Sequence, residues 1–203
     1  MPVDVQPFDN NVISNLLGAL VSSQDIRARV LLNAPPESRF VQSVYFLSLQ
    51  NVLAGTRSDA VVGTRYLAVN HGLAVAADVI EEDGRARIAS VSSGYRVQQA
   101  VDAIPVINRL PDVQRARYEL RALSVPGVQT EAYWLKFING DGDRFVPYVT
   151  LNKNLKMGNT YDWGDFLRAI QEKASMNLQF FQATSSQVNS GRSAQVRPDA
   201  SRP

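Results

Sequence analysis

The fold is decided by residues 115–150, which run RARYELRALSVPGVQTEAYWLKFINGDGDRFVPYVT. Apolar and polar side chains alternate in three stretches, a period of two that is typical of half-buried strands. Pro126-Gly127 and the polar run 139–143 separate the stretches with turn-forming residues. The segment therefore predicts three successive antiparallel strands, and Pro147 places the last at a sheet edge or a bulge because proline cannot donate to a ladder.

The middle of these strands is apolar on both faces. Alternation puts Trp134 and Ile138 on one side, and Tyr133, Leu135 and Phe137 on the other. Such a strand is predicted to be central and covered on both sides, either by the rest of the chain or by a partner. Cover from within the chain is favoured, since it contains helical segments that can supply it.

The remaining elements follow from periodicity and turn chemistry. Apolar stripes at helical spacing predict helices over 9–23, for about three turns after Gly94, and from Trp163 to Phe181 behind an Asp162 cap. Leu73–Ile80 and Arg85–Ser92 predict a hairpin joined at Asp83-Gly84. Short strands are predicted for residues 26–32 and 66–69, and a loop for 55–64. The apolar residues of 40–53 fit both a helical and an extended periodicity, and the segment is assigned to a helix because of its length.

Together these elements predict an α+β fold in a single domain over residues 1–181. Its single antiparallel sheet of about five to six strands would pack against helices, curved as in cystatin-like folds. Small and polar residues dominate from residue 182, which predicts a disordered tail over 182–203. A likeness at the level of fold implies no function.

Composition narrows the chemistry. The absence of cysteine among the 203 residues excludes disulfides, thiolate metal sites and a cysteine nucleophile. The first residues lack the pattern of a signal peptide, and no apolar run is long enough to span a bilayer. We therefore predict a soluble, cytoplasmic protein with no membrane partner.

The charge distribution disfavours nucleic acid as a partner. The net charge is only +2, and three arginines against one aspartate beyond residue 181 account for this whole excess. A neutral body with a faintly basic tail is a poor electrostatic match for a phosphate backbone.

His71 is the only histidine, and so the only side chain whose ordinary pKa lies near neutrality. As a general base it would need an orienting carboxylate, for which Asp78 is the nearby candidate, and the pair would define a hydrolase-like enzyme. The competing interpretation, a solvated loop histidine, is favoured. Serines 90, 92 and 93 before Gly94 lack the Gly-x-Ser-x-Gly pattern of a nucleophile elbow, and helix capping explains them better.

No metal or cofactor is predicted. Asn139, Asp141 and Asp143 are spaced like the start of a calcium loop, but Arg144 and Thr150 stand where that loop needs glycine and glutamate. Turn formation explains the three residues equally well. Neither a phosphate loop nor a Gly-x-Gly-x-x-Gly motif is present.

Four aromatic residues, Tyr133, Trp134, Phe137 and Tyr148, are candidates for a binding face, although aromatics on adjoining strands also build cores. With no catalytic constellation evident, the leading hypothesis is a non-enzymatic protein-interaction or assembly module. It would bind a protein partner or a second copy through its sheet face or edge. The hydrolase-like enzyme with His71 as base is the alternative.

Overall fold

The computed structural model describes residues 3–4 and 26–193, with side chains between residues 27 and 180. The helix predicted over 9–23 lies outside the described residues. In chain order the elements are β1 (Val3–Asp4), α2 (Ile26–Asn33), β2 (Arg39–Phe46), α3 (Leu49–Ala54), β3 (Val61–Asn70), β4 (Leu73–Glu82), β5 (Arg85–Ser93), α4 (Tyr95–Ile107), α5 (Pro111–Gln114), β6 (Tyr118–Val125), β7 (Thr130–Phe137), β8 (Arg144–Thr150) and α6 (Trp163–Ser193).

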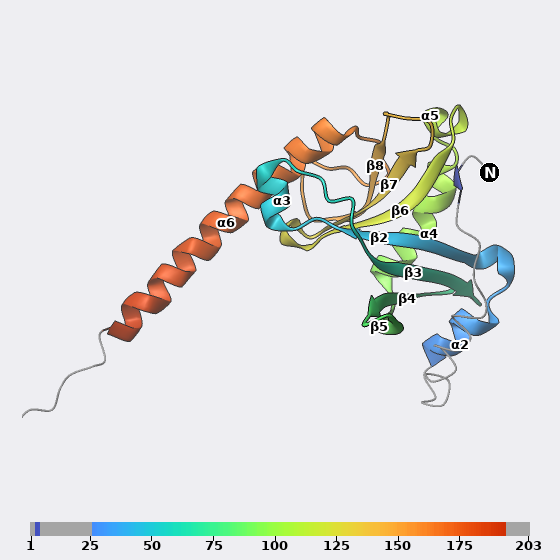
Figure 1. Cartoon of the computed structure of the whole chain (residues 1–203), viewed down its shortest axis with the longest axis horizontal. Coiled ribbons are helices and arrows are strands. Elements are labelled where there is room, and N and C mark those ends of the chain that lie inside the picture. Colours follow the sequence, from blue (N-terminus) through green and yellow to red (C-terminus); the bar gives the residue numbers. More distant parts are fainter. Residues whose placement is uncertain (1–2, 5–25, 194–203) are drawn as a thin grey trace, which may run out of the picture.

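One mixed sheet organises the molecule, in the order β5-β4-β3-β2-β6-β7-β8, and the short β1 pairs with β6 (Figure 1). Strands β2 to β5 and strands β6 to β8 form two antiparallel meanders. The meanders join through a parallel pairing of β2 with β6, since α4 carries the chain back across the sheet before β6 begins. The α+β class is confirmed, whereas the prediction of five to six strands, all antiparallel, is wrong.

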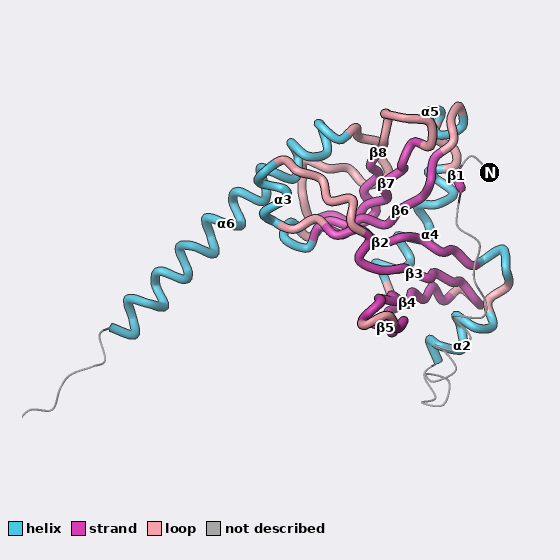
Figure 2. Tube along the Cα trace, in the orientation of Figure 1, coloured by secondary structure: helices cyan, strands magenta, loops and turns pink. Residues whose placement is uncertain are grey.

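The sheet curves around α4. The guanidinium of Arg65 on β3 lies 3.2 Å from the hydroxyl of Tyr148 on β8, although three strands separate β3 from β8. In a flat sheet these backbones would be about 19 Å apart, so the two side chains meet only because the sheet is concave on this side. Helix α4 packs against this concave face, through Val97, Ala100 and other members of a cluster that extends to β8 (Figure 2).

Helices also cover the opposite, convex face. Helix α2 packs on the β3–β4 half through Val30 and Leu31. On the β7–β8 half, Phe166 and Ile170 of α6 are fully buried against aromatic side chains of the strands. The fold thus has three layers, with α4 on one side of the sheet and α2, α3 and α6 on the other.

The middle strand β7 is buried on both faces, as predicted. Tyr133 and Leu135 join the α4 cluster, whereas Ala132 and Trp134 join the α6 cluster. Ile138 follows the end of β7 and is exposed, so it does not share the buried face of Trp134. The cover comes from the chain itself, which leaves this strand unavailable to a partner.

Several predicted elements are confirmed. The three strands of residues 115–150 are β6, β7 and β8, and β8 is an edge strand as Pro147 indicated. The hairpin is β4–β5, with left-handed backbone at both Asp83 (φ 54°) and Gly84 (φ 72°), as its tight turn requires. The Asp162 cap accepts a hydrogen bond from the backbone N–H of Asp165 at 2.8 Å.

Three local predictions are wrong. Residues 26–32 form helix α2 rather than a strand, and 40–53 divides between strand β2 and helix α3. Strand β3 begins at Val61, inside the predicted loop. Leu47 and Ser48 separate β2 from α3, and a single period fitted across that break could not represent both elements.

Helix α6 leaves the body and continues to Ser193, beyond the end predicted at Phe181 (Figure 1). The predicted disordered tail therefore overlaps a described helix, and residues 194–203 lie outside the described residues. Among the helices described, none combines the length and apolar character that a membrane crossing needs.

Candidate functional site

A pocket of about 470 Å³ opens between the start of α4 and the concave face of the sheet. Its charged rim consists of Arg65 from β3, Arg96 from α4 and Glu131 from β7. Ser92 and Ser93 at the end of β5 add hydroxyl groups. The curvature of the sheet creates this site, because it brings β3 and β7 toward the same end of one helix.

Arg65 is the centre of the polar network. Its Nε and Nη2 donate to the two carboxylate oxygens of Asp78, at 2.7 and 3.1 Å, in a bidentate pair across β3 and β4. Its Nη1 donates to the hydroxyl of Tyr148 at 3.2 Å. Burial acts to lower the pKa of Arg65, but hydrogen bonding and attraction to these groups outweigh it and raise the pKa above its usual value. The guanidinium is therefore permanently charged.

Glu131 completes the network on the other wall. Its Oε1 accepts from Nη1 of Arg96 at 3.3 Å, and its Oε2 accepts from the hydroxyl of Tyr148 at 3.1 Å. Oε2 also lies 3.6 Å from Nη1 of Arg65. The side chains of Arg65 and Glu131 are only 17% and 19% exposed, so the two charges interact in a partly desolvated setting.

Tyr133 packs its ring against Tyr148 of this network and makes separate hydrogen bonds. Its hydroxyl donates to the carbonyl of Ala100 at 2.8 Å and accepts from Nε2 of Gln42 at 3.3 Å. Burial raises the pKa of Tyr133 and that of Tyr148 above the usual range, so both remain neutral donors. The carbonyl oxygen of the Gln42 side chain is buried with no hydrogen-bond partner among the described residues.

The floor of the pocket is apolar. Leu67 and Ala76 from the sheet and Val97 and Ala100 from α4 are all buried residues that line it. Gly94 is the N-cap of α4 and has no side chain to cap the helix. The predicted serine cap is therefore wrong, and Ser92 and Ser93 instead line the pocket.

The predicted catalytic pair is not brought together. His71 and Gly72 form the exposed β3–β4 turn, with φ values of 49° and 76°. Asp78 stands five residues along β4 from Leu73, which is about 17 Å of strand. Asp78 is instead committed to Arg65, with a further hydrogen bond from Ser90 at 3.2 Å.

The four predicted binding aromatics divide between the two faces. Tyr133 and Tyr148 belong to the pocket network, with ring centroids 4.7 Å apart. Phe137 lies on the same face but packs against Tyr118, 5.5 Å away, outside the pocket. Trp134 is buried on the convex face, 4.8 Å from Tyr45. They form no single exposed face.

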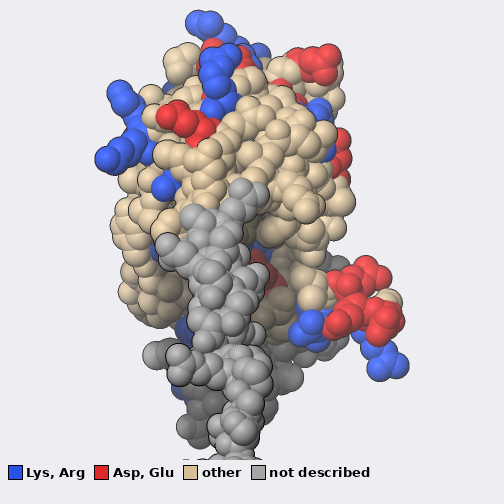
Figure 3. All heavy atoms as spheres, turned by 90° about the vertical axis from the view of Figure 1, so that its left-hand side faces the viewer, with Lys and Arg blue, Asp and Glu red and all other residues tan. Residues whose placement is uncertain are grey.

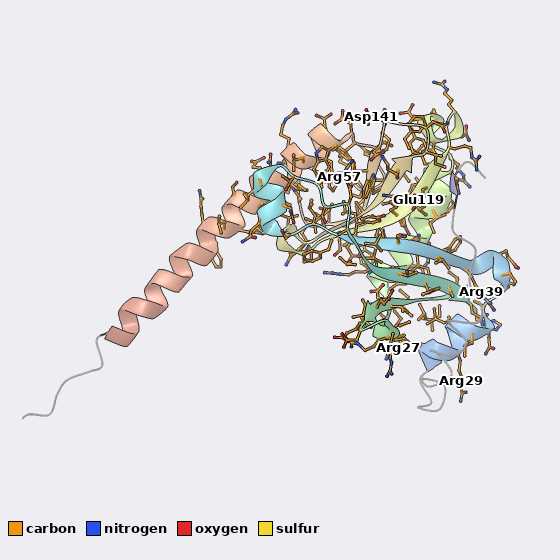
Figure 4. All side chains as sticks on the ribbon, viewed as in Figure 1. Arg27, Arg29, Arg39, Arg57, Glu119 and Asp141 are labelled. Carbon is orange, nitrogen blue, oxygen red and sulfur yellow. The ribbon has the colours of Figure 1, made fainter. Side chains whose placement is uncertain are left out.

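Asp143 from the calcium-like run has a structural role. Its carboxylate accepts from the Trp134 indole at 2.8 Å, the Phe137 backbone N–H at 3.0 Å and Arg57 at 2.8 Å (Arg57 is labelled in Figure 4). Lys136 adds an ion pair at 3.2 Å. Burial acts to raise the pKa of Asp143, but hydrogen bonds from Phe137, Trp134 and Lys136 outweigh it and lower the pKa.

Protein donors thus occupy the carboxylate that a metal would need. Among the described residues, no group of three or more histidine, cysteine, aspartate or glutamate side chains is placed to hold a metal ion. Acidic and basic side chains are interspersed on the face shown in Figure 3.

The two sheet edges differ in how they are protected. On β8, Phe145 exchanges backbone hydrogen bonds with Tyr161 at 2.8 and 2.9 Å, and Gly158 donates to the carbonyl of Pro147. On β5, most residues are exposed, and among the described strands β5 pairs with β4 alone. A register shift opposite Asp78/Val79 and the exposed Arg87 interrupt the β5 edge, features that discourage indiscriminate strand pairing.

Sequence reasoning missed Arg65, Arg96 and Glu131 as site residues. Arg65 was the available signal, because this charged residue directly precedes the apolar run Tyr66–Val69, which was predicted as a short strand. Tyr148 and Glu131 could not be named as partners of Arg65, since their approach depends on how far the sheet curls.

Comparison with protein-family models, curated proteins and solved structures found no match to this chain.

Proposed function

We propose that this chain is a non-enzymatic binding protein whose small-molecule ligand occupies the pocket under α4. The observation that carries the proposal is a cavity of about 470 Å³ in which a fixed charged network meets an apolar floor. Ligand sites typically have volumes of about 300–1,000 Å³ and combine apolar walls with a few oriented polar groups. Strongly shifted pKa values also occur at Arg65, which lines the pocket, and at Tyr148 and Tyr133, which lie behind its lining.

The state of the titratable groups favours binding over catalysis. A general base needs a lone pair within reach of a substrate proton. Asp78 does not line the pocket, and both of its oxygens accept from Arg65, while Glu131 already accepts from Arg96 and Tyr148. His71, the only histidine, lies in an exposed turn and does not line the pocket. These groups suit a rigid receptor better than a hydrolase.

A substitution that fills the pocket tests the proposal. Ser92 lines the pocket on the concave face of β5, so Ser92→Trp should occupy the cavity. Arg87→Trp is the matched control, because Arg87 is an exposed residue of the same strand that does not line the pocket.

Saturation-transfer NMR with 2-naphthoate, 2-naphthamide and 2-naphthol supplies the readout. We expect at least one probe to bind the wild type and Arg87→Trp, and to lose binding to Ser92→Trp. Absence of binding by all three, or equal binding by Ser92→Trp, would overturn the proposal. Circular dichroism of each variant establishes that it is folded.

Protein assembly through the sheet is a second candidate function, favoured by the one-sided pairing of β5. An added strand on this edge would extend the sheet by β-augmentation. Light scattering coupled to size exclusion tests for a second copy. A dimer that Ala89→Pro converts to a monomer supports this function, and a strict monomer at all concentrations counts against self-assembly.

A further inference from the structure

We infer that the ligand of the pocket carries one carboxylate attached to a compact apolar group. This inference rests on the proposed function and specifies its ligand class. It follows from an imbalance between hydrogen-bond donors and acceptors around the cavity, taken with the apolar floor.

Donors exceed acceptors at the rim. A guanidinium has five N–H groups. Arg65 directs one from Nε and one from Nη2 to Asp78 and one from Nη1 to Tyr148, which leaves two with no hydrogen bond to a described residue, although Nη1 also lies 3.6 Å from Oε2 of Glu131. Arg96 directs one from Nη1 to Glu131, and its side chain is 65% exposed. Both arginines line the cavity, and each has N–H groups that make no hydrogen bond to a described residue.

The acceptors are already engaged. Each carboxylate oxygen of Asp78 and Glu131 accepts at least one hydrogen bond within the network. Asp78 does not line the cavity, so a ligand donor would find only the second lone pairs of the Glu131 oxygens, while a ligand acceptor would meet a larger number of unused guanidinium N–H groups. The pocket therefore selects an acceptor-rich group, and a carboxylate matches the planar fork of a guanidinium.

The charge balance limits that group to one negative charge. Two arginines and two carboxylates make the network neutral, and Glu131 itself borders the cavity. A dianion such as a phosphate monoester would increase its repulsion from Glu131 along with its attraction to the arginines, so a neutral network gives no net charge to offset the lost hydration of the second negative charge. Beneath the rim, Leu67 and Val97 provide the apolar surface against which a ring or branched chain would pack.

Isothermal titration with isosteric probes tests this inference. We expect 2-naphthoate to bind about 10- to 100-fold more tightly than 2-naphthamide, the range of one charge-assisted hydrogen bond. We also expect it to bind more tightly than 2-naphthyl phosphate. Arg96→Gln should remove most of this preference for the carboxylate, and Arg96→Lys should restore part of it because the charge returns.

Arg109→Gln is the matched control. Arg109 is an exposed residue just after α4, so its substitution changes the net charge equally without touching the pocket. The preference should survive it. Equal binding of naphthoate and naphthamide, tighter binding of the phosphate, or a preference unchanged by Arg96→Gln would overturn the carboxylate assignment while leaving a binding pocket in place. Failure of 2-naphthoate, 2-naphthamide and 2-naphthol all to bind would overturn the proposed function itself.

Discussion

Replacing Arg65 by methionine should destabilise the fold substantially, because Arg65 links β3, β4 and β8. The substitution removes two hydrogen bonds to Asp78 and one to Tyr148. Breaking a buried ion pair costs about 3–5 kcal/mol. We expect the lower end, about 3 kcal/mol, since the Asp78 side chain retains 26% exposure and a hydrogen bond from Ser90.

Urea unfolding followed by tryptophan fluorescence measures this free energy, and the double variant Arg65→Met/Asp78→Asn isolates the pair. Removing both charges should cost less than the sum of the two single substitutions, by about 1.5 kcal/mol or more for a contacting, charge-assisted pair. In thermal unfolding, 3 kcal/mol corresponds to about 6–12 °C for a protein of this size. A loss below about 1 kcal/mol for Arg65→Met, or strictly additive costs, would refute the role assigned to Arg65.

Three further predictions concern the scaffold. Because its pKa is lowered, the ionised Asp143 stabilises the fold. This contribution is complete above the unfolded pKa of about 4 and is lost as pH falls through the folded pKa. In urea titrations from pH 6 to pH 2, the free energy of unfolding should therefore decline less steeply for Asp143→Asn. Gly63→Ala should lower the free energy of unfolding by about 1–3 kcal/mol, because a Cβ there would lie 2.6 Å from the Val79 carbonyl oxygen. At Gly72 an added Cβ would meet no neighbouring atom, so Gly72→Ala tests φ strain alone. Phe166→Ala should cost about 3–5 kcal/mol in the same assay and Phe180→Ala under about 0.5, since these side chains are 0% and 68% exposed; comparable losses would contradict the packing of α6.

The sequence predicted the β6–β8 half of the fold well. Alternation through Tyr133 and Trp134 is a local signal, and it identified a strand buried on both faces. Pro147 marked the sheet edge for an equally local reason, the missing N–H of proline. Elements of regular period between clear turns were therefore predictable.

The half containing β2 was less predictable. Strand β2 pairs with β6 more than 70 positions along the chain, and this long-range pairing makes the sheet mixed. No local periodicity indicates which distant strand will be a neighbour, or that residues 26–32 will form a helix over β3. The candidate site depends on the same information. Asp78, Tyr133 and Tyr148 were singled out, but the contact of Tyr148 with Arg65 requires the curved sheet, and that of Asp78 requires the register of β3 with β4.

The central claim is that a small molecule binds between α4 and the concave face of the sheet. Methyl-resolved NMR during a titration with 2-naphthoate tests it most directly, because Leu67, Ala76, Val97 and Ala100 place methyl groups on the pocket floor. We expect saturable shifts concentrated in these four residues. Saturable shifts confined to methyl groups elsewhere, or no shifts at any concentration of the probe, would contradict it.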